Sequence, residues 1–302
     1  MRFVTTRDGT ELYVKDWGRG RPVVMLHGWP LSADTFDELA VALAEEGCRA
    51  IAYDRRGFGR SSQPWTGYDY DTLSDDLAAV LEATGAVDAT LLGFSMGGGE
   101  VARYMSRHGG RDVRQAVLIA SVVPYLPLTD DNPDGVDPAV FAQMDEDLRR
   151  DRAEFWTGFF KDFYGVGLLA QPVSDEVLRW SAALAMQAGL KGVLDCLQAF
   201  ATTDFRGDLA AFTVPTLILH GSADKTVPVA ISARKAAAGI RGSRLIEYDG
   251  APHGLLGSHA DEVIDDVLTF VLGEEARRSG STRTRPAEVP IDPLVTGAPL
   301  VS

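Results

Sequence analysis

The sequence predicts an α/β protein with a mostly parallel central sheet, helices on both faces and a helical insertion near the middle of the chain. Two observations predict this class. Short apolar runs of strand type alternate with amphipathic helical patterns over most of the chain, and such alternation is typical of a parallel sheet covered by helices. Between residues 124 and 212 the alternation stops, and helical patterns follow a loop punctuated by prolines. An insertion of this kind is usually a lid or cap.

The first half of the chain gives the alternation in order. Strands are expected near residues 12–14, 22–26, 49–53, 89–94 and 113–120. The first helix has Ser32 as its expected N-cap and ends at Gly47. The second carries apolar residues at helical spacing and ends near Gly85, and the third is expected over residues 97–108. The run at 22–26 is almost continuously apolar, as expected of a strand buried on both faces.

The second half resumes the pattern after the insertion. Strands are expected at 214–220 and 244–248, and helices at 231–238 and 263–272. The predicted organisation is therefore a core formed by residues 1–123 and 213–273, with a helical cap at 124–212. Residues 274–302 are rich in Arg, Ser, Pro and Gly with little apolar periodicity, which predicts a flexible C-terminal tail.

Composition and charge exclude several classes of protein. The 302 residues carry a net charge of −14, which disfavours binding to nucleic acid or to anionic membranes. No signal-peptide core and no bilayer-length apolar run are recognisable, so a cytoplasmic protein is expected. The only two cysteines, Cys48 and Cys196, are too few for a disulfide framework or a zinc site, and we expect buried free thiols.

The stretch Gly93-Phe94-Ser95-Met96-Gly97 carries the strongest chemical signal. It lies directly after a predicted buried strand and directly before a predicted helix. A serine on such a tight turn projects its hydroxyl from the edge of the sheet, and flanking glycines avoid clashes there. The N-terminus of the following helix presents free backbone N–H groups toward developing negative charge. Ser95 is therefore the candidate nucleophile.

With this motif the chain resembles the α/β-hydrolase family, whose catalytic residues follow in the order nucleophile, acid, histidine. The resemblance covers roughly residues 1–273 and implies an α/β-hydrolase fold. It indicates Asp224, in the loop 221–228, as the catalytic acid and His253, in the loop 249–254, as the base. A histidine can remove the serine proton and return it to the leaving group. The aspartate would orient the imidazole and stabilise its protonated form.

A second motif, His27-Gly28-Trp29-Pro30, follows the strand at 22–26 and resembles the oxyanion loop of that family. The backbone N–H groups of Trp29 and Met96 are then the expected oxyanion donors, each worth about 3 kcal/mol in the transition state. His27 is expected to shape this turn. Structural roles are also expected for His108, His220 and His259.

No cofactor and no metal are expected. The sequence Gly57-Phe58-Gly59 lacks the third glycine of a dinucleotide-binding fingerprint, and the histidines form no metal-ligand pattern. Asp54, after the strand at 49–53, is interpreted as a turn-stabilising carboxylate in preference to an acid catalyst.

The predicted cap carries a group of aromatic residues that could form either its own core or an apolar substrate pocket. Its members are Phe155, Trp156, Phe159, Phe160, Phe163 and Tyr164. We take Phe159 and Phe163, together with Trp29 and Pro30, as candidate pocket residues.

The chain resembles one branch of the family, the bacterial arylesterases that are also called cofactor-free (non-heme) chloroperoxidases or perhydrolases. The segments that carry this resemblance are residues 27–30, 54–62 and 93–104. In that branch the proline matching Pro30 is associated with accepting hydrogen peroxide in place of water. The resemblance implies a serine hydrolase that cleaves short-acyl or aryl esters or lactones through an acyl-enzyme, with perhydrolysis as a further activity. The chain departs from the branch in a longer acidic loop at 129–137 and in the tail.

Other functions stay open. The same three residues can serve hydrolysis of a carbon–carbon bond or an amide, and a hydrolase-fold receptor can keep them while only binding its ligand. Epoxide hydrolases and haloalkane dehalogenases are disfavoured, because their relatives place aspartate where this chain has Ser95. The expected partner is a small ester substrate, and the sequence leaves a homo-oligomer open.

Overall fold

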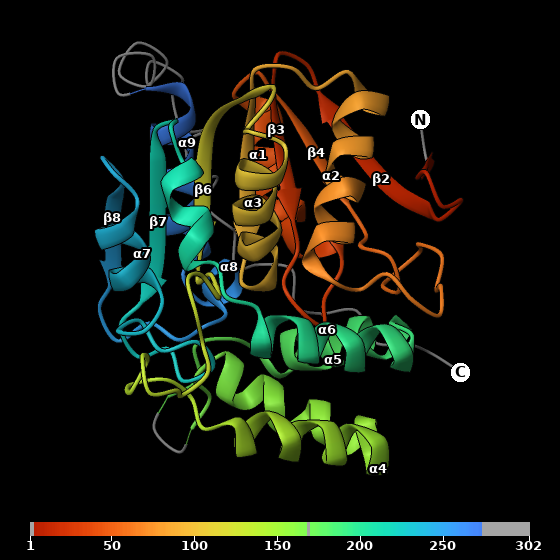
Figure 1. Cartoon of the computed structure of the whole chain (residues 1–302), viewed down its shortest axis with the longest axis vertical. Helices are drawn as coiled ribbons and strands as arrows, with labels where there is room; N and C mark the ends of the chain where they lie inside the picture. The colour runs from red at the N-terminus through yellow and green to blue at the C-terminus, as the bar shows by residue number, and fades with distance from the viewer. Residues whose placement is uncertain (1–2, 168–169, 274–302) are drawn as a thin grey trace, which may run out of the picture.

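The computed structural model describes residues 3–167 and 170–273, and its centre is an eight-stranded sheet (Figure 1). The strand order is β1-β2-β4-β3-β5-β6-β7-β8. Pairing is antiparallel between β1 and β2 and between β2 and β4, and parallel from β4 through to β8. The strands are β1 (Phe3–Thr5), β2 (Glu11–Gly18), β3 (Arg21–Leu26), β4 (Cys48–Tyr53), β5 (Ala89–Phe94), β6 (Val113–Ile119), β7 (Thr216–Gly221) and β8 (Arg244–Tyr248).

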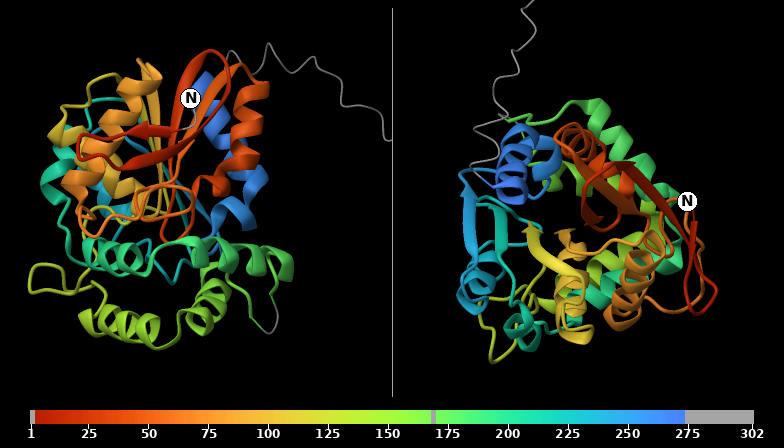
Figure 2. Two further views of the ribbon diagram at one scale, coloured as in Figure 1. Left: turned by 90° about the vertical axis from the view of Figure 1, so that its right-hand side faces the viewer. Right: turned by 90° about the horizontal axis from the view of Figure 1, so that it is seen from above.

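Helices cover both faces of this sheet, which confirms the predicted fold class. The helices α1 (Asp37–Glu45) and α9 (Ala260–Leu272) lie together on one face (Figure 2). The opposite face is covered by α2 (Tyr70–Thr84), α3 (Met96–Arg107) and α7 (Ala233–Gly239). Apolar side chains from both layers pack on the sheet and form one continuous core.

One predicted helix end agrees with the structure and one helix start differs from its prediction. Gly85 ends α2 in the left-handed conformation at φ 61°, as its position predicted. Ser32, however, caps the short 3₁₀ helix η1 (Ala33–Phe36), and α1 begins only at Asp37. The edge strand β1 was not predicted, because three residues are too short to show an alternating pattern.

The insertion consists mainly of three helices that lie beyond the carboxyl ends of the strands (Figure 1). They are α4 (Pro138–Phe163), α5 (Asp175–Gln187) and α6 (Leu190–Thr202), followed by the 3₁₀ helix η2 (Arg206–Ala211). Helix α4 is kinked at Asp151, whose Oδ1 accepts the backbone N–H groups of Ala153 and Glu154, each at 3.0 Å. The division into core and cap stays a prediction, and the predicted tail, 274–302, lies outside the described residues.

The parallel register gathers the catalytic candidates at one edge of the sheet. At that edge Leu26 of β3 lies beside Tyr53 of β4 and Gly93 of β5, and Gly221 of β7 lies beside Tyr248 of β8. The loops that follow β3, β5, β7 and β8 therefore share this edge, where ligands bind in open α/β sheets.

The cysteine prediction is confirmed, because Cys48 and Cys196 are both buried and unpaired. Among the helices of residues 3–167 and 170–273, none combines the length and apolarity needed to cross a bilayer.

Candidate active site

Ser95 lies on the turn between β5 and α3 in an uncommon backbone conformation, with φ 53° and ψ −118°. Its backbone N–H donates to the carbonyl of Ile119 on β6 at 2.8 Å. The flanking glycines are sterically required. A Cβ on Gly93 would lie 2.5 Å from the carbonyl oxygen of Gly97, and a Cβ on Gly97 would overlap the backbone of Leu26. Only this spacing of glycines therefore allows the turn to present Ser95.

The structure brings Ser95, His253 and Asp224 together from three different strand ends. His253, after β8, places Nε2 2.9 Å from Ser95 Oγ. Its Nδ1 lies 2.6 Å from Oδ2 of Asp224, which follows β7. All three side chains are buried, and Ser95 is 6% exposed. With Nδ1–H donated to the carboxylate, Nε2 is free to accept the proton of the serine hydroxyl.

Asp224 is held as a carboxylate. Its Oδ1 accepts the backbone N–H groups of Thr226 at 2.9 Å and Val227 at 2.7 Å. Burial alone would raise the pKa of Asp224, but the imidazoles of His253 and His220 outweigh it and lower that pKa to about 2. The group is therefore ionised at neutral pH and can orient the imidazole of His253.

The loop His27–Pro30 lies against the nucleophile. A side chain at Gly28 would come within 3.0 Å of Ser95 Cβ, so only glycine allows the loop to approach this closely. Among the described residues, neither the Trp29 nor the Met96 backbone N–H donates to a protein acceptor. Free N–H groups of this kind are what an oxyanion site requires.

A cavity of about 510 Å³ opens from Ser95 toward helix α4. Its apolar wall includes Trp29 and Phe159, two of the four candidate pocket residues, whose rings meet edge to face at 5.4 Å. The other two, Pro30 and Phe163, are not among its lining residues. Phe163 instead packs edge to face against the imidazole of His253 at 4.9 Å. The mouth is charged, and its ionisable residues are Asp147, Arg150, Asp151, Glu154, Asp162 and Lys225.

Three neighbours of the site could not be selected from the sequence. His220 touches Asp224, and the buried Arg55 contacts both His27 and Glu100. The sequence offers only weak signals for two of them. His220 stands four residues before the candidate acid Asp224, and Glu100 is a charged residue that directly follows three glycines in α3. Asp54 accepts the backbone N–H groups of Ala33 and Arg60, in agreement with a turn-stabilising carboxylate.

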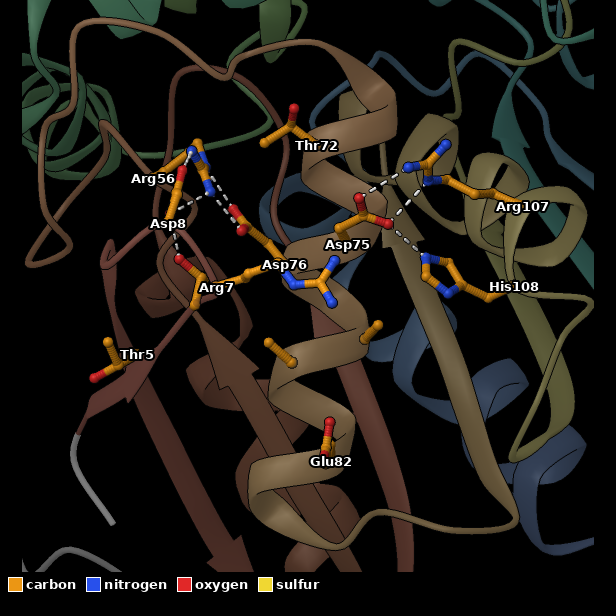
Figure 3. A pocket seen from close by; sticks show the side chains of 13 residues that line it. Thr5, Arg7, Asp8, Arg56, Thr72, Asp75, Asp76, Glu82, Arg107 and His108 are labelled. Atoms are coloured by element: carbon orange, nitrogen blue, oxygen red, sulfur yellow. Dashed lines mark hydrogen bonds and ion pairs between the residues drawn. The ribbon is translucent and has the colours of Figure 1, made fainter.

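Within the described ranges, no group of three or more His, Cys, Asp or Glu side chains is arranged to hold a metal ion. A second hollow, of about 910 Å³, lies on the surface between the N-terminal strands and the helices α2 and α3 (Figure 3). None of the candidate catalytic residues lines it.

A nucleophilic serine on a strand-to-helix turn, with an acid and a histidine from later strand ends, defines a class of hydrolase. The chain belongs to the α/β-hydrolase fold family, whose model matches residues 21–260. A bifunctional esterase/perhydrolase from Acinetobacter calcoaceticus is 42% identical over 275 residues, covering 90% of this chain and 99% of that protein. A non-heme chloroperoxidase from Streptomyces lividans is 42% identical over 274 residues, with the same 90% and 99% coverage.

A solved structure of a similar protein supports the same family branch. The crystal structure of a bromoperoxidase from Bacillus anthracis matches with a TM-score of 0.86 and 42% identity, covering 89% of this chain and 98% of that chain. The predicted resemblance to the branch of non-heme chloroperoxidases and esterase/perhydrolases is confirmed by these similarities.

Proposed function

We propose that the protein is a serine esterase that hydrolyses short-acyl or aryl carboxylic esters, or lactones, through an acyl-enzyme on Ser95. The observation that carries the proposal is the 2.9 Å contact between His253 Nε2 and Ser95 Oγ at the inner end of an apolar cavity. The similarity to a bifunctional esterase/perhydrolase supports the same reaction class.

In the first half-reaction, Ser95 Oγ attacks the carbonyl carbon of the ester while His253 Nε2 takes the hydroxyl proton. The negative charge that develops on the carbonyl oxygen is stabilised by the backbone N–H groups of Trp29 and Met96. The carbon–oxygen bond to the alcohol then breaks, and the leaving alkoxide receives the proton from His253. Asp224 stabilises the transient imidazolium through its contact with Nδ1.

In the second half-reaction, water attacks the acyl-enzyme with His253 again acting as the base. The ester bond to Ser95 breaks, and the serine recovers its proton as the carboxylic acid leaves. Hydrogen peroxide can replace water as the nucleophile, in which case the acyl group leaves as a peracid. A peracid can oxidise a halide ion to a hypohalous acid in solution and is itself reduced to the carboxylic acid.

The helices α4, α5 and α6 act in this account as a cap that shields the acyl-enzyme from bulk water. Apolar residues of α4 and α6, among them Phe155, Phe159 and Phe200, line the cavity beside Ser95. An apolar wall of this kind suits an aryl or short alkyl group, whose transfer from water it favours.

The test is hydrolysis of p-nitrophenyl acetate by the wild type and by Ser95→Ala, with and without hydrogen peroxide, while peracid is assayed. Ser74→Ala is the matched control, because Ser74 is a buried serine of α2 outside the site. We expect turnover and peracid release in the wild type and in Ser74→Ala only. Full turnover by Ser95→Ala would overturn the mechanism, whereas a single stoichiometric release of p-nitrophenol by the wild type would favour the receptor function.

A further inference from the structure

A fully buried ion pair spans the carboxyl ends of three neighbouring strands, next to the segments that carry the candidate oxyanion donors. Arg55 follows β4, and Glu100 lies in α3, which follows β5, while β3 runs between these two strands. The Nε atom of Arg55 donates to Glu100 Oε1 at 2.6 Å, and both side chains are 1% exposed. The pair therefore joins the segment after β4 to the helix after Ser95 across the end of the strand that leads to His27.

Arg55 also holds His27 at two points. Its Nη2 donates to the carbonyl oxygen of His27 at 2.5 Å, and its backbone N–H donates to His27 Nε2 at 2.9 Å. Because Nε2 accepts, the neutral ring carries its proton on Nδ1, which lies 2.9 Å from the carbonyl oxygen of Gly28. Burial, together with the charge of Arg55, lowers the pKa of His27 well below its usual value, so this arrangement persists at neutral pH.

These contacts lie close to both oxyanion donors. The Trp29 N–H is two residues beyond His27, and the Met96 N–H is four residues before Glu100, one turn earlier in α3. The two N–H groups come from separate strand ends, yet both must point at one substrate oxygen to stabilise its charge. The link from His27 through Arg55 to Glu100 connects the two segments that carry them.

Stability alone is a weak reason for such a pair. Burying two charges costs several kcal/mol of desolvation per ion, and apolar replacements of similar shape are often neutral or stabilising. We propose that Arg55 and Glu100 are positioning residues that fix the separation and direction of the Trp29 and Met96 N–H groups. The proposal rests on the proposed function, because it assigns the pair to the oxyanion site of that reaction.

The next residue in the chain offers a matched control. Arg56 is also 1% exposed and also forms a buried ion pair, with Asp76 of α2 at 2.6 Å. It pairs with Asp8 at 2.8 Å as well, and both contacts lie at the second hollow (Figure 3). Across residues 3–167 and 170–273, no hydrogen bond or ion pair joins Arg56 to the loop His27–Pro30.

The experiment compares Arg55→Lys and Glu100→Gln with Arg56→Lys and Asp76→Asn in the full chain. Two assays are run on each variant: steady-state kinetics on p-nitrophenyl acetate, which gives kcat and KM, and the labelling of Ser95 by an alkyl fluorophosphonate, which gives an extent and a rate constant. The final extent of labelling gives the fraction of molecules whose active site is correctly folded, and rates are expressed per labelled site. The labelling rate constant depends on the oxyanion donors, because the phosphoryl oxygen of the reagent takes the place of the substrate oxygen.

We expect Arg55→Lys and Glu100→Gln to lower kcat about 10- to 100-fold per labelled site, since displacing a donor by about 1 Å has effects of this size. Their KM should change less than about threefold, and their labelling rate constants should fall in parallel with kcat. Arg56→Lys and Asp76→Asn should keep both rates within about threefold per labelled site, whatever stability they lose.

Equal losses per labelled site in all four variants would overturn the proposal, as would unchanged rates in Arg55→Lys and Glu100→Gln. If neither of these two variants accumulates as folded protein, Tyr53→Phe replaces them. That change removes only the 3.1 Å hydrogen bond from the Tyr53 hydroxyl to Glu100 Oε2. A labelling rate constant in Tyr53→Phe equal to that of the wild type would then reject the proposal. A failure of the proposed esterase function can be told apart from a failure of this positioning proposal, because only the former would show as full turnover by Ser95→Ala.

Discussion

The Nε2 atom of His220 lies 3.2 Å from Oδ2 of Asp224, the same carboxylate oxygen that Nδ1 of His253 approaches at 2.6 Å. Nε2 of His220 also lies 2.8 Å from the carbonyl oxygen of Val227. A carbonyl only accepts, so this nitrogen carries a proton and presents it to both oxygens. Two imidazole groups therefore face Oδ2, while two backbone N–H groups serve Oδ1, and the carboxylate is held in one orientation.

Replacing His220 with phenylalanine should lower kcat about tenfold and leave KM nearly unchanged. The reason is that a hydrogen bond to a charged group contributes about 1.5–3 kcal/mol, and its loss lets the Asp224 carboxylate reorient away from His253. Steady-state kinetics on p-nitrophenyl acetate measures the effect, with His259→Gln as a control outside the site. A kcat for His220→Phe within twofold of the wild type would show that the other three donors suffice.

The pH dependence of stability should report on His27. Burial and the charge of Arg55 lower the pKa of His27 well below 6.5 in the folded protein. The unfolded chain therefore binds one more proton below about pH 6.5, and this contribution to stability falls by about 1.4 kcal/mol per pH unit as the pH is lowered. Urea unfolding between pH 5 and pH 7 should show a steeper loss in the wild type than in His27→Gln. Parallel curves for the two proteins would contradict a neutral, buried His27.

Gly97→Ala should destabilise the protein by at least about 2 kcal/mol and remove esterase activity. A Cβ at this position overlaps the carbonyl group of Leu26, which is backbone in β3 and has no room to yield. Gly207→Ala is the control, because a Cβ there meets no atom within 4 Å, and its effect should stay within about 0.5 kcal/mol. Chemical denaturation of both variants measures the difference. Similar stability of the two would argue against the close packing of α3 on β3.

Phe159→Ala should shift substrate preference toward longer acyl chains. The ring of Phe159 narrows the cavity beside Trp29, and removing it opens apolar space worth about 1–3 kcal/mol per accommodated methylene group. We expect the ratio of kcat/KM for p-nitrophenyl hexanoate to that for the acetate to rise about tenfold. Val140→Ala, at an exposed position on the rim of the same cavity, should leave the ratio within twofold. An unchanged ratio in Phe159→Ala would place the acyl group elsewhere.

The strand ends explain how much of the site could be predicted from the sequence. Ser95 stands directly after the buried strand β5, so its local motif was enough to select it. Asp224 and His253 lie in the loops that follow β7 and β8, and the resemblance to the α/β-hydrolase family indicated them by their order in the chain. Because the strands are parallel and in register, the loops that follow them all lie at the same, carboxyl end of the sheet. The alternation of strands and helices likewise predicts the fold class, because each element carries its own apolar periodicity.

Contacts between segments distant in sequence could not be predicted in this way. Arg55 and Glu100 are 45 residues apart, and nothing local indicates that their charges meet in the core. Phe159 and Phe163 stand one helical turn apart on α4, yet Phe159 lines the cavity and Phe163 packs on His253. Which side of an aromatic helix faces the substrate depends on how the helix packs, and periodicity gives only its apolar stripe.

The most direct test of the account is to trap the acyl-enzyme. The wild type is mixed with p-nitrophenyl acetate, quenched in acid within milliseconds, digested and examined by mass spectrometry, with Ser95→Ala treated in the same way. We expect one acetyl group on the peptide that contains Ser95 and none on that peptide in the variant. Steady turnover of the ester by the wild type with the acetyl group on another residue, or with no acetyl group on the protein at all, would contradict it.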